Sequence, residues 1–344
     1  MADEGRFANQ ASIPVQISRK PFEGAHSIES LFRTIREYLL SKDIAVAHCE
    51  SPYFSKGLLN RLRMVWWASR LEGSIFHVTG DIQFVVLGLS RHKSILTIHD
   101  LNILNRLKGI RRAVIRLFWF QLPLRKASQV TVISEATKQE LLREFPMDEH
   151  RIHVIPDCVS PIFQPCPRPF RSECPVILQI GTKQNKNLSR LIKAIEGINC
   201  KLHIVGKPQG DLVKELELHN IDHKFSVNLS EQEIYQAYCE CDLVAMVSTE
   251  EGFGMPIIEA QFVERPVVTS DCSSMPEVAG QGAILVDPLD WKAIRIGISR
   301  ILDEPELRRK LVDWGRDNRT RFSIEMVSEQ YLRVYFSIQE EGFS

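Results

Sequence analysis

Two glutamates separated by seven residues flank a glycine-rich segment in the second half of the chain. This segment, residues 250–260, reads EEGFGMPIIEA and contains Glu251 and Glu259. Glycine permits backbone conformations closed to other residues, and proline suits the first turn of a helix. The pattern predicts a strand ending near Ser248, a bent loop and a helix from about Pro256. The N-terminus of such a helix is a ready site for a phosphate group.

The two carboxylates suit different parts of a sugar ligand. Glu259 would lie about one turn into the helix, where it could accept hydrogen bonds from sugar hydroxyls. Glu251 precedes the loop and would lie nearer to whatever extends beyond a bound phosphate. On this segment alone, an ordinary strand–turn–helix connection with two solvated glutamates remains an alternative.

Two other segments place polar side chains after apolar strands. In IGTKQNKNLSRLIKAI a strand over 176–181 ends at Gly181, and Lys186 precedes the next helix, where an ammonium group could neutralise a diphosphate. In ILTIHDL, His99 follows a strand and could hydrogen-bond a sugar hydroxyl or transfer a proton. A surface lysine and a structural histidine are the alternatives.

Composition narrows the class of protein. The chain has 344 residues, which indicates two domains or one large one, and Lys+Arg equals Asp+Glu at 43 each, so no global charge points to nucleic acid. The eight cysteines include no CxxC pair, which argues against a zinc ribbon or a thioredoxin-type site. No G-x-G-x-x-G occurs, which argues against an NAD-dependent dehydrogenase.

The ends of the chain and its apolar runs indicate a compartment. The first residues, MADEGRFANQASIP, contain no apolar signal segment, and no uninterrupted apolar run approaches the roughly 20 residues of a membrane span. We therefore expect a cytoplasmic protein.

Apolar strands alternate with amphipathic helical patterns along most of the chain, which predicts an α/β fold with parallel sheets. Strands are expected at 14–18, 44–48, 74–80, 94–100, 129–134, 176–181, 201–206, 242–248, 265–270 and 283–287. Ser230 and Glu233 form a capping-box pattern that predicts a helix start.

A proline-rich segment divides the alternation into two halves. Residues 156–175 contain six prolines in twenty residues, so they can neither extend a helix nor lie centrally in a sheet. We predict a first domain over 1–155, a linker over 156–175, a second domain over 176–322 and a final helix over 323–344. Two such halves imply a cleft that binds ligands beyond the carboxyl ends of the strands.

Together these motifs resemble the retaining glycosyltransferases of family 4, the "glycosyl transferases group 1" family, which have the GT-B fold of two Rossmann-like domains. The resemblance covers most of the chain and is strongest from about Gln129 to Asp290. It includes VTVISEATKQELLREF, HRIHVIPDCVSPIF and the segment that begins STEEGFGMPIIEAQFVERPVVTSD. The paired glutamates, seven residues apart, match the most specific motif of this family.

The resemblance implies roles for individual residues. Glu259 would bind the ribose of a nucleotide-sugar, Lys186 would stabilise the departing diphosphate, and His99 would lie near the donor sugar. Glu251, His99 and Lys186 form the implied catalytic set. The donor would further contact the residues around the two loops, which are Gly181, Thr182, Lys183, Phe253, Gly254 and Met255. The final helix would cross back onto the first domain, which would bind the acceptor.

Two departures from the family pattern affect these roles. Thr182 stands where the family usually carries an arginine, and Lys183 is the candidate to compensate for it. The first domain lacks the glycine-rich acceptor loop and has RKPFEGAHSIES instead, in which Gly24, His26 and Ser27 could line the acceptor site.

The expected reaction moves a hexose-type sugar from a UDP- or GDP-sugar to a hydroxyl acceptor, with retention of configuration. Many transferases hold the diphosphate through an Asp-x-Asp pair and a metal, but this chain contains no Asp-x-Asp. We therefore expect neither a metal nor a cofactor besides the nucleotide-sugar. A non-catalytic nucleotide-sugar-binding protein of the same fold is the alternative, and Thr182 is the feature that favours it.

A basic stretch in the first half lacks acidic residues altogether. Between Leu101 and Ser134 there are seven cations and no Asp or Glu, interleaved with apolar and aromatic residues. This pattern suits an interfacial helix on anionic lipid, and residues 60–70 are similar. We predict peripheral contact of 101–126 with the inner face of the plasma membrane and a glycan or lipid-linked acceptor of bacterial surface polysaccharide synthesis. A core-facing helix with a solvated basic face is the alternative, and nucleic acid is disfavoured because no binding module accompanies the stretch.

Overall fold

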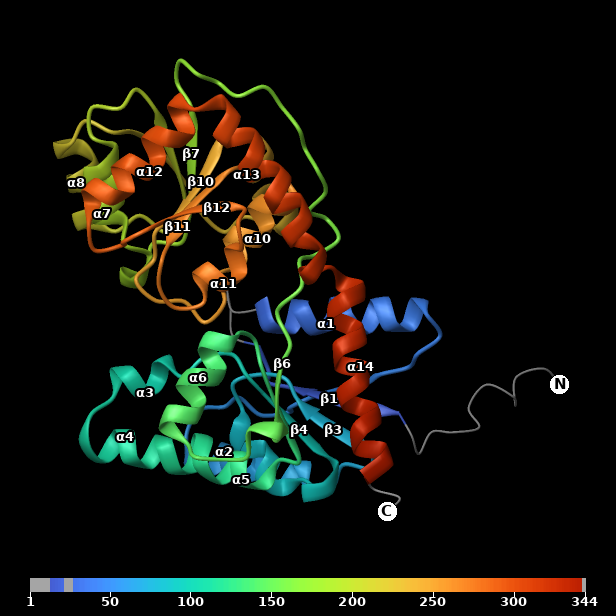
Figure 1. Cartoon of the computed structure of the whole chain (residues 1–344). Helices are drawn as coiled ribbons and strands as arrows, with labels where there is room; N and C mark the ends of the chain where they lie inside the picture. The colour runs from blue at the N-terminus through green and yellow to red at the C-terminus, as the bar shows by residue number, and fades with distance from the viewer. Residues whose placement is uncertain (1–12, 22–26, 342–344) are drawn as a thin grey trace. The chain divides into compact units, whose positions relative to one another are not determined.

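The computed structural model describes residues 13–21 and 27–341, with side chains described over 28–338 in the second range. The chain divides into two compact units (Figure 1). The first unit comprises the chain up to Asp157 together with Ile324 and the residues after it, and the second comprises Cys158–Ser323. Each unit contains one parallel α/β sheet, as the alternation of strands and helices predicts.

The first unit is built on a sheet of six strands in the order β2-β1-β3-β4-β5-β6, all paired in parallel. The strands are β1 (Pro14–Ser18), β2 (Ala47–Glu50), β3 (Ile75–Val78), β4 (Ser94–Ile98), β5 (Gln129–Val132) and β6 (Ile152–Val154). Every residue of β3, β4 and β5 is buried, because helices cover both faces of a parallel sheet.

The predicted strand over 44–48 is wrong in its position, since β2 covers Ala47–Glu50. The chain leaves the preceding helix through a left-handed Asp43, whose φ is 59°. The backbone N–H of Ile44 then donates to the carbonyl oxygen of Leu39 at 3.0 Å. This closing turn uses the residues that the apolar pattern assigned to the strand.

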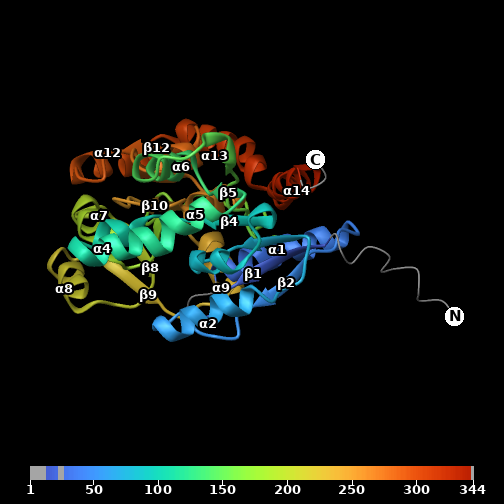
Figure 2. The same ribbon diagram turned by 90° about the horizontal axis from the view of Figure 1, so that it is seen from below.

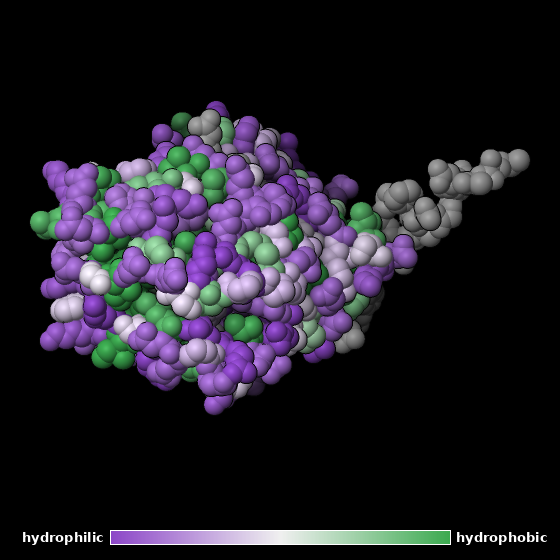
Figure 3. Space-filling model, turned by 90° about the horizontal axis from the view of Figure 1, so that it is seen from above, coloured by the Kyte–Doolittle hydropathy of each residue, from purple (hydrophilic) through white to green (hydrophobic). Residues whose placement is uncertain are grey.

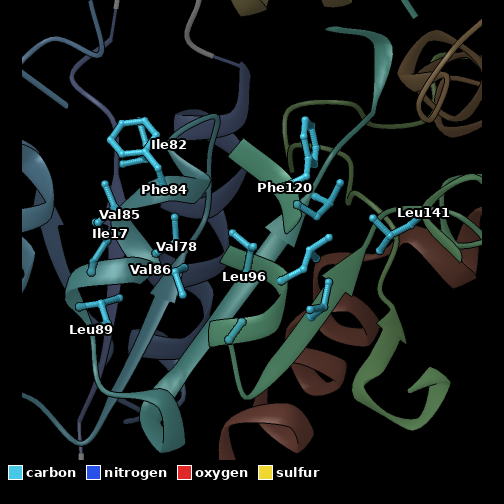
Figure 4. Packing of buried hydrophobic residues seen from close by; sticks show 14 of the residues in the cluster. Ile17, Val78, Ile82, Phe84, Val85, Val86, Leu89, Leu96, Phe120 and Leu141 are labelled. Atoms are coloured by element: carbon cyan, nitrogen blue, oxygen red, sulfur yellow. The ribbon is translucent and has the colours of Figure 1, made fainter. Parts of the chain in front are cut away.

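Helices α1 (Ser27–Ser41) and α14 (Ile324–Glu341) pack against each other over the first sheet. The core cluster drawn in Figure 4 includes Phe84, Phe120 and Leu141 together with the strand residues Val78 and Leu96. The remaining elements of this unit are α2 (Leu58–Ala68), η2 (Gln83–Gly88), η3 (Arg91–Lys93), α3 (Asn102–Arg106), α4 (Gly109–Ile115), η4 (Arg116–Gln121, a wide π-type turn), α5 (Leu122–Lys126), α6 (Glu135–Glu144) and η5 (Glu149–Arg151).

A buried chain of hydrogen bonds joins α14 to the first sheet. The hydroxyl of Tyr335 lies 2.9 Å from His77 Nδ1, and His77 Nε2 lies 2.6 Å from Thr97 Oγ1. Gln16 Nε2 donates to the same tyrosine hydroxyl at 3.1 Å. Burial and, to a smaller extent, the neighbouring His99 lower the pKa of His77 from 6.5 to about 3, so the imidazole is neutral in the folded chain near neutral pH.

The second unit has a six-stranded sheet in the order β12-β11-β10-β7-β8-β9, again parallel throughout. Its strands are β7 (Val176–Ile180), β8 (Lys201–Val205), β9 (Asp222–Ser226), β10 (Leu243–Met246), β11 (Val267–Ser270) and β12 (Ala283–Val286). Successive strands run outward from β7 in one direction and from β10 in the other. The strand order therefore reverses between these two neighbours.

The helices of the second unit follow the strands in alternation. They are η6 (Gln184–Lys186), α7 (Leu188–Ile195), α8 (Gly210–Leu218), α9 (Glu231–Glu240), α10 (Met255–Phe262), α11 (Met275–Ala279), α12 (Trp291–Asp303), α13 (Pro305–Asn318) and η7 (Arg319–Phe322). The capping box predicted at Ser230 and Glu233 is confirmed at the start of α9.

The proline-rich segment packs on the second unit through Asp242. Its carboxylate accepts hydrogen bonds from the backbone and side chain of Arg171 at 3.1 and 2.8 Å and from the N–H of Val176 at 2.7 Å. Arg265 donates to five carbonyl oxygens, one of them that of Cys166. A pocket of about 440 Å³ is lined by residues that include Asp242 and Arg265 and lies where the proline-rich segment contacts the second unit.

The surface in Figure 3 is mostly hydrophilic, and its hydrophobic residues form small separate groups. Within the described residues, none of the helices has the length and apolar character needed to cross a bilayer. All eight cysteines are free thiols.

The neutral His77 makes the stability of the first unit depend on pH. Its pKa is lower in the folded than in the unfolded chain, so the stabilisation is complete above pH 6.5 and is lost as the pH falls toward 3. By linkage, about 2 kcal/mol is lost between pH 7.5 and pH 5. Over this interval we expect wild type to lose stability relative to His77→Gln by this amount, measured as the difference between their unfolding midpoints in urea at the two pH values. His92→Gln, at an exposed position, is the control, and an equal change in wild type and His77→Gln would contradict the assignment.

Candidate functional site

The reversal of strand order in the second unit brings two loops together. In sheets of this kind the loops beyond two neighbouring strands diverge where the order reverses, which leaves room for a ligand at their carboxyl ends. Here those strands are β7 and β10. The loop after β7 carries Gly181–Asn187, and the loop after β10 carries the glycine-rich segment with Glu251.

Gly181 shapes the first loop. Its φ is 90°, a left-handed conformation that favours glycine, and its N–H donates to the carbonyl of Val205 at 2.7 Å. A Cβ at this position would lie 3.0 Å from Cε of Lys186. The side chain of Lys186 therefore packs directly on the backbone of Gly181, where any other residue would place a Cβ.

Lys186 ends on Glu251. The distance from Lys186 Nζ to Glu251 Oε1 is 2.7 Å, and both side chains are only 15% exposed. Asn185 Nδ2 donates to the same carboxylate oxygen at 3.2 Å and to the carbonyl of Glu250 at 3.0 Å. Two residues that the sequence placed on separate loops thus form one ion pair, with Asn185 orienting its carboxylate.

Asn187 fixes the loops to each other. It is buried, has a φ of 59° and donates from Nδ2 to the carbonyls of Val247 at 2.9 Å and Pro288 at 2.7 Å. The ends of β7 and β10 and the loop after β12 are therefore joined by one side chain. An unpaired buried carbonyl is costly, so this amide is a strong constraint on where Lys186 can lie.

The glycine-rich loop leads into α10 as predicted. Gly254 is the N-cap residue, with a φ of 113°, and Pro256 lies in the first turn. Ser274 Oγ donates to the carbonyl of Phe253 at 2.7 Å, and Ser273 Oγ donates to that of Glu251 at 2.6 Å. Within the first turn, the N–H of Ile257 donates to the carbonyl oxygen of Gly254 at 2.9 Å and Pro256 has no N–H, so the N–H of Met255 is the one that this turn can offer to a ligand.

Glu259 lies one turn into α10 and faces Tyr238 of α9, whose hydroxyl donates to Glu259 Oε2 at 2.5 Å. Burial raises the pKa of Glu259 to about 7, although the tyrosine hydrogen bond and Lys186 both lower it. A carboxyl of this kind changes its charge near neutral pH, which makes it sensitive to any ligand that donates hydrogen bonds to it.

Thr182 and Lys183 begin the turn after Gly181. A Cβ on Gly206 would lie 2.8 Å from the Thr182 methyl, so the threonine packs on bare glycine backbone, and Gln209 Nε2 donates to the Thr182 carbonyl at 2.7 Å. Lys183 is exposed and forms no ion pair within the described part of the chain. Both side chains lie on the loop that holds Lys186.

In the first unit, His99 lies at the carboxyl end of β4 as predicted. It is 9% exposed, and its Nε2 lies 2.9 Å from the carbonyl of Thr79, which requires a proton on that nitrogen. Asp157 is close enough for His99 to lower its pKa, against the larger increase from burial. Of the predicted acceptor residues, Gly24 and His26 lie outside the described residues, and Ser27 begins α1 with its side chain not described.

Sequence reasoning missed Asn185, Asn187, Tyr238, Ser273 and Ser274. The asparagines had a weak signal, since they flank Lys186 at a strand-to-helix turn where asparagine tolerates left-handed backbone. Tyr238 had none, because it reaches Glu259 from another helix. Within the described residues no group of three or more His, Cys, Asp or Glu side chains is arranged to hold a metal ion.

Comparison with protein families places this geometry in a known class. Two parallel six-stranded sheets, the second with its strand order reversed at the glycine-rich loop, have the GT-B fold of solved glycosyltransferases. The family described as Glycosyltransferase Family 4 matches residues 12–161, and the family described as Glycosyl transferases group 1 matches residues 167–318. Both halves of the chain thus match glycosyltransferase families, as the resemblance predicted.

Several characterised proteins are similar to this chain. MMP alpha-(1->4)-mannosyltransferase of Mycolicibacterium hassiacum is 29% identical over 61% of this chain and 54% of its own length. O-antigen chain mannosyltransferase B of Escherichia coli is 24% identical over 81% of this chain and 78% of its own. The Anabaena protein HepE, solved with UDP and glucose, has a TM-score of 0.75 and 15% identity, covering 94% of this chain and 99% of its own. The chain thus spans about half the length of the first of these relatives.

The raised pKa of Glu259 predicts that its charge destabilises the ligand-free fold. The folded pKa, about 7, exceeds the ordinary value of 4.5, so the protonated form stabilises the fold below pH 4.5 and this contribution is lost as the pH rises through 7. We expect Glu259→Gln to raise the unfolding temperature at pH 8, by an amount equivalent to about 3 kcal/mol, and to change little at pH 5. Glu217→Gln, on the exposed face of α8, is the matched control, and a lower unfolding temperature for Glu259→Gln at pH 8 would show that its carboxylate is stabilising.

Proposed function

We propose that the chain transfers a hexose-type sugar from a UDP- or GDP-sugar to a hydroxyl of a glycan or lipid-linked glycan in the synthesis of a bacterial surface polysaccharide. One observation carries this proposal: Lys186, Glu251 and Glu259 gather where the strand order reverses, beside the N-terminus of α10. The names of the relatives support it, since two are mannosyltransferases and a third protein of this fold was solved with UDP and glucose.

Binding of the donor begins with an exchange of partners at Lys186. Its ammonium is neutralised by Glu251 at 2.7 Å. A diphosphate that enters beside the first turn of α10 carries more negative charge than one carboxylate, so it attracts Lys186 and can accept a hydrogen bond from the N–H of Met255 at the start of the helix. Glu251, still held by Asn185, then becomes free to accept hydrogen bonds from the hydroxyls of the donor sugar.

Glu259 binds the ribose in this scheme. Two ribose hydroxyls that donate to its carboxylate favour the charged form and lower its pKa from about 7. Donor binding near pH 7 therefore releases a proton, and affinity weakens as the pH falls below 7. Tyr238 keeps one carboxylate oxygen in place, which leaves the other for the ribose.

The transfer step breaks the bond between the anomeric carbon and the β-phosphate oxygen while the acceptor oxygen forms a bond to the same carbon from the same face. The bonding electrons leave with the diphosphate, whose charge Lys186 and the α10 N-terminus stabilise, and the acceptor proton moves to the departing phosphate oxygen. His99 lies near the donor sugar in this proposal. The reaction then needs neither a metal nor a further cofactor.

The donor site is tested by ligand-induced stabilisation. We expect one of UDP-, GDP- or ADP-sugars to raise the unfolding temperature of wild type equally with and without EDTA, because ligand at 100 times its dissociation constant stabilises by about 2.7 kcal/mol. Glu259→Ala should lose this shift. The absence of a shift with every nucleotide-sugar would overturn the proposed function, and loss of the shift in EDTA would contradict the metal-free site.

Lys186 is expected to act in transfer rather than in folding. Lys186→Met should lower kcat by about 100-fold or more, as loss of one charge-stabilising group does in other enzymes, with the unfolding temperature little changed. Lys214→Met on the exposed face of α8 removes the same charge and should leave kcat unchanged. A kcat within a few fold of wild type in Lys186→Met would refute its role, and nucleotide-sugar binding without any transfer by wild type would favour a non-catalytic binding protein.

The stereochemistry of transfer is open to a direct measurement. Attack from the face of the leaving group keeps the anomeric configuration, so the NMR coupling of the new glycosidic bond should match that of the donor. Inversion in the first-formed product would exclude this mechanism.

A further inference from the structure

Two helices of the first unit, α2 and α4, expose large apolar side chains. On α2 these are Leu58, Leu59, Leu62 and Trp66, and on α4 and the adjoining η4 they are Ile110, Val114, Leu117 and Phe118. Each is between 38% and 83% exposed. We call these eight residues the α2–α4 face.

Helical spacing gathers these side chains on one side of each helix. Leu59, Leu62 and Trp66 are three and four residues apart, and so share one stripe of α2. Ile110 and Val114 share a stripe of α4 in the same way. The opposite side of α2 is buried through Met64 and Ala68, so the exposed stripe is additional to the core contact of this helix.

Aromatic contacts join the two helices. The guanidinium of Arg61 on α2 lies 4.6 Å from the ring centroid of Trp119 on η4. Trp119 in turn packs on Phe84 of the core, at 4.8 Å between ring centroids. Figure 2, which looks at the protein from below, shows α2, α4 and α5 toward the viewer.

The two segments that carry the α2–α4 face contain basic residues but no acidic ones. Residues 51–71 contain four Lys or Arg and residues 101–134 contain seven, and neither segment contains an Asp or Glu. Within the described residues, only Arg112 and Arg116 of these cations are paired with a carboxylate, that of Glu144 on α6. The guanidinium of Arg70 lies 3.5 Å from the ring centroid of Trp66, so cation and aromatic ring are in direct contact within the face.

We propose that the α2–α4 face docks on the surface of an anionic lipid bilayer. Aliphatic side chains flanked by unpaired cations, with a tryptophan among them, match the boundary between acyl chains and negatively charged headgroups. The sequence predicted such contact for 101–126 alone, and the structure adds α2 as its second half. This inference goes beyond the proposed transfer reaction and is independent of the donor site.

The chemistry of the face disfavours two other occupants. In a dimer formed through this face, the eleven cations of these two segments in one copy would face the same eleven cations in the other. The segments contain no carboxylate that could pair with them, and like charges that face each other across an interface are costly. Single-stranded nucleic acid would gain from aromatic rings on which bases stack, but six of the eight residues are aliphatic and only Trp66 and Phe118 are aromatic.

Vesicle sedimentation with the whole chain tests the proposal. We expect wild type to bind vesicles of phosphatidylcholine with 30% phosphatidylglycerol at least tenfold more tightly than vesicles of phosphatidylcholine alone. High salt should weaken this binding, because it screens the charges. The triple variant Leu59→Gln, Leu62→Gln, Ile110→Gln should lose at least tenfold in affinity. The matched control is Leu218→Gln, Ile296→Gln, which replaces exposed apolar residues of α8 and α12.

Each outcome bears on the proposal. Equal vesicle binding by wild type and the triple variant, or no binding by wild type, would overturn it. Dimerisation of wild type that the triple variant loses would assign the face to a second copy, and RNA binding lost in the same variant would assign it to nucleic acid. Nucleotide-sugar stabilisation should be the same in the triple variant and wild type, so failure of membrane docking is distinguishable from failure of the proposed function.

Discussion

The reversal of strand order between β7 and β10 is the constraint on which the site in the second unit depends. Two neighbouring parallel strands end at the same edge of the sheet, but the chain leaves them in opposite directions. The loops after them therefore diverge, which leaves room for a ligand between them. Lys186 comes from one loop and Glu251 from the other, and their 2.7 Å ion pair spans the opening that this topology creates.

Backbone conformation makes that ion pair possible. Left-handed residues, Gly181 before the turn and Asn187 after it, fold the loop back on itself, and the absence of a side chain at Gly181 lets the lysine lie across it. The amide of Asn187 then ties three strand ends together. A rigid loop of this kind keeps a charged group in place without a ligand, which is how binding sites limit the entropy lost when a ligand arrives.

The two glutamates of the site are held by different means, and this gives them different chemistry. Glu251 is compensated by an ammonium group and an amide, whereas Glu259 has a tyrosine hydroxyl and a largely buried position that raises its pKa to about 7. The charged form of Glu259 therefore lowers the free energy of unfolding, as is common for groups in binding sites. The α2–α4 face of the first unit also lowers the stability of the fold, because its apolar side chains are exposed to water.

The sequence by itself determined the fold class, most strand positions, the capping box at Ser230 and the glycine-rich turn before α10, because these follow from local periodicity and from the few residues that tolerate special backbone conformations. It misplaced β2, where the helix-closing turn at Asp43 used the apolar residues. Only the tertiary structure decided that Lys186 pairs with Glu251, that Tyr238 holds Glu259 and that α2 lies beside η4. Each of these contacts joins residues that are far apart in the chain, or that lie on elements whose relative orientation is set by packing. Neither the composition nor the spacing of residues along the chain predicts which of them meet in the folded protein.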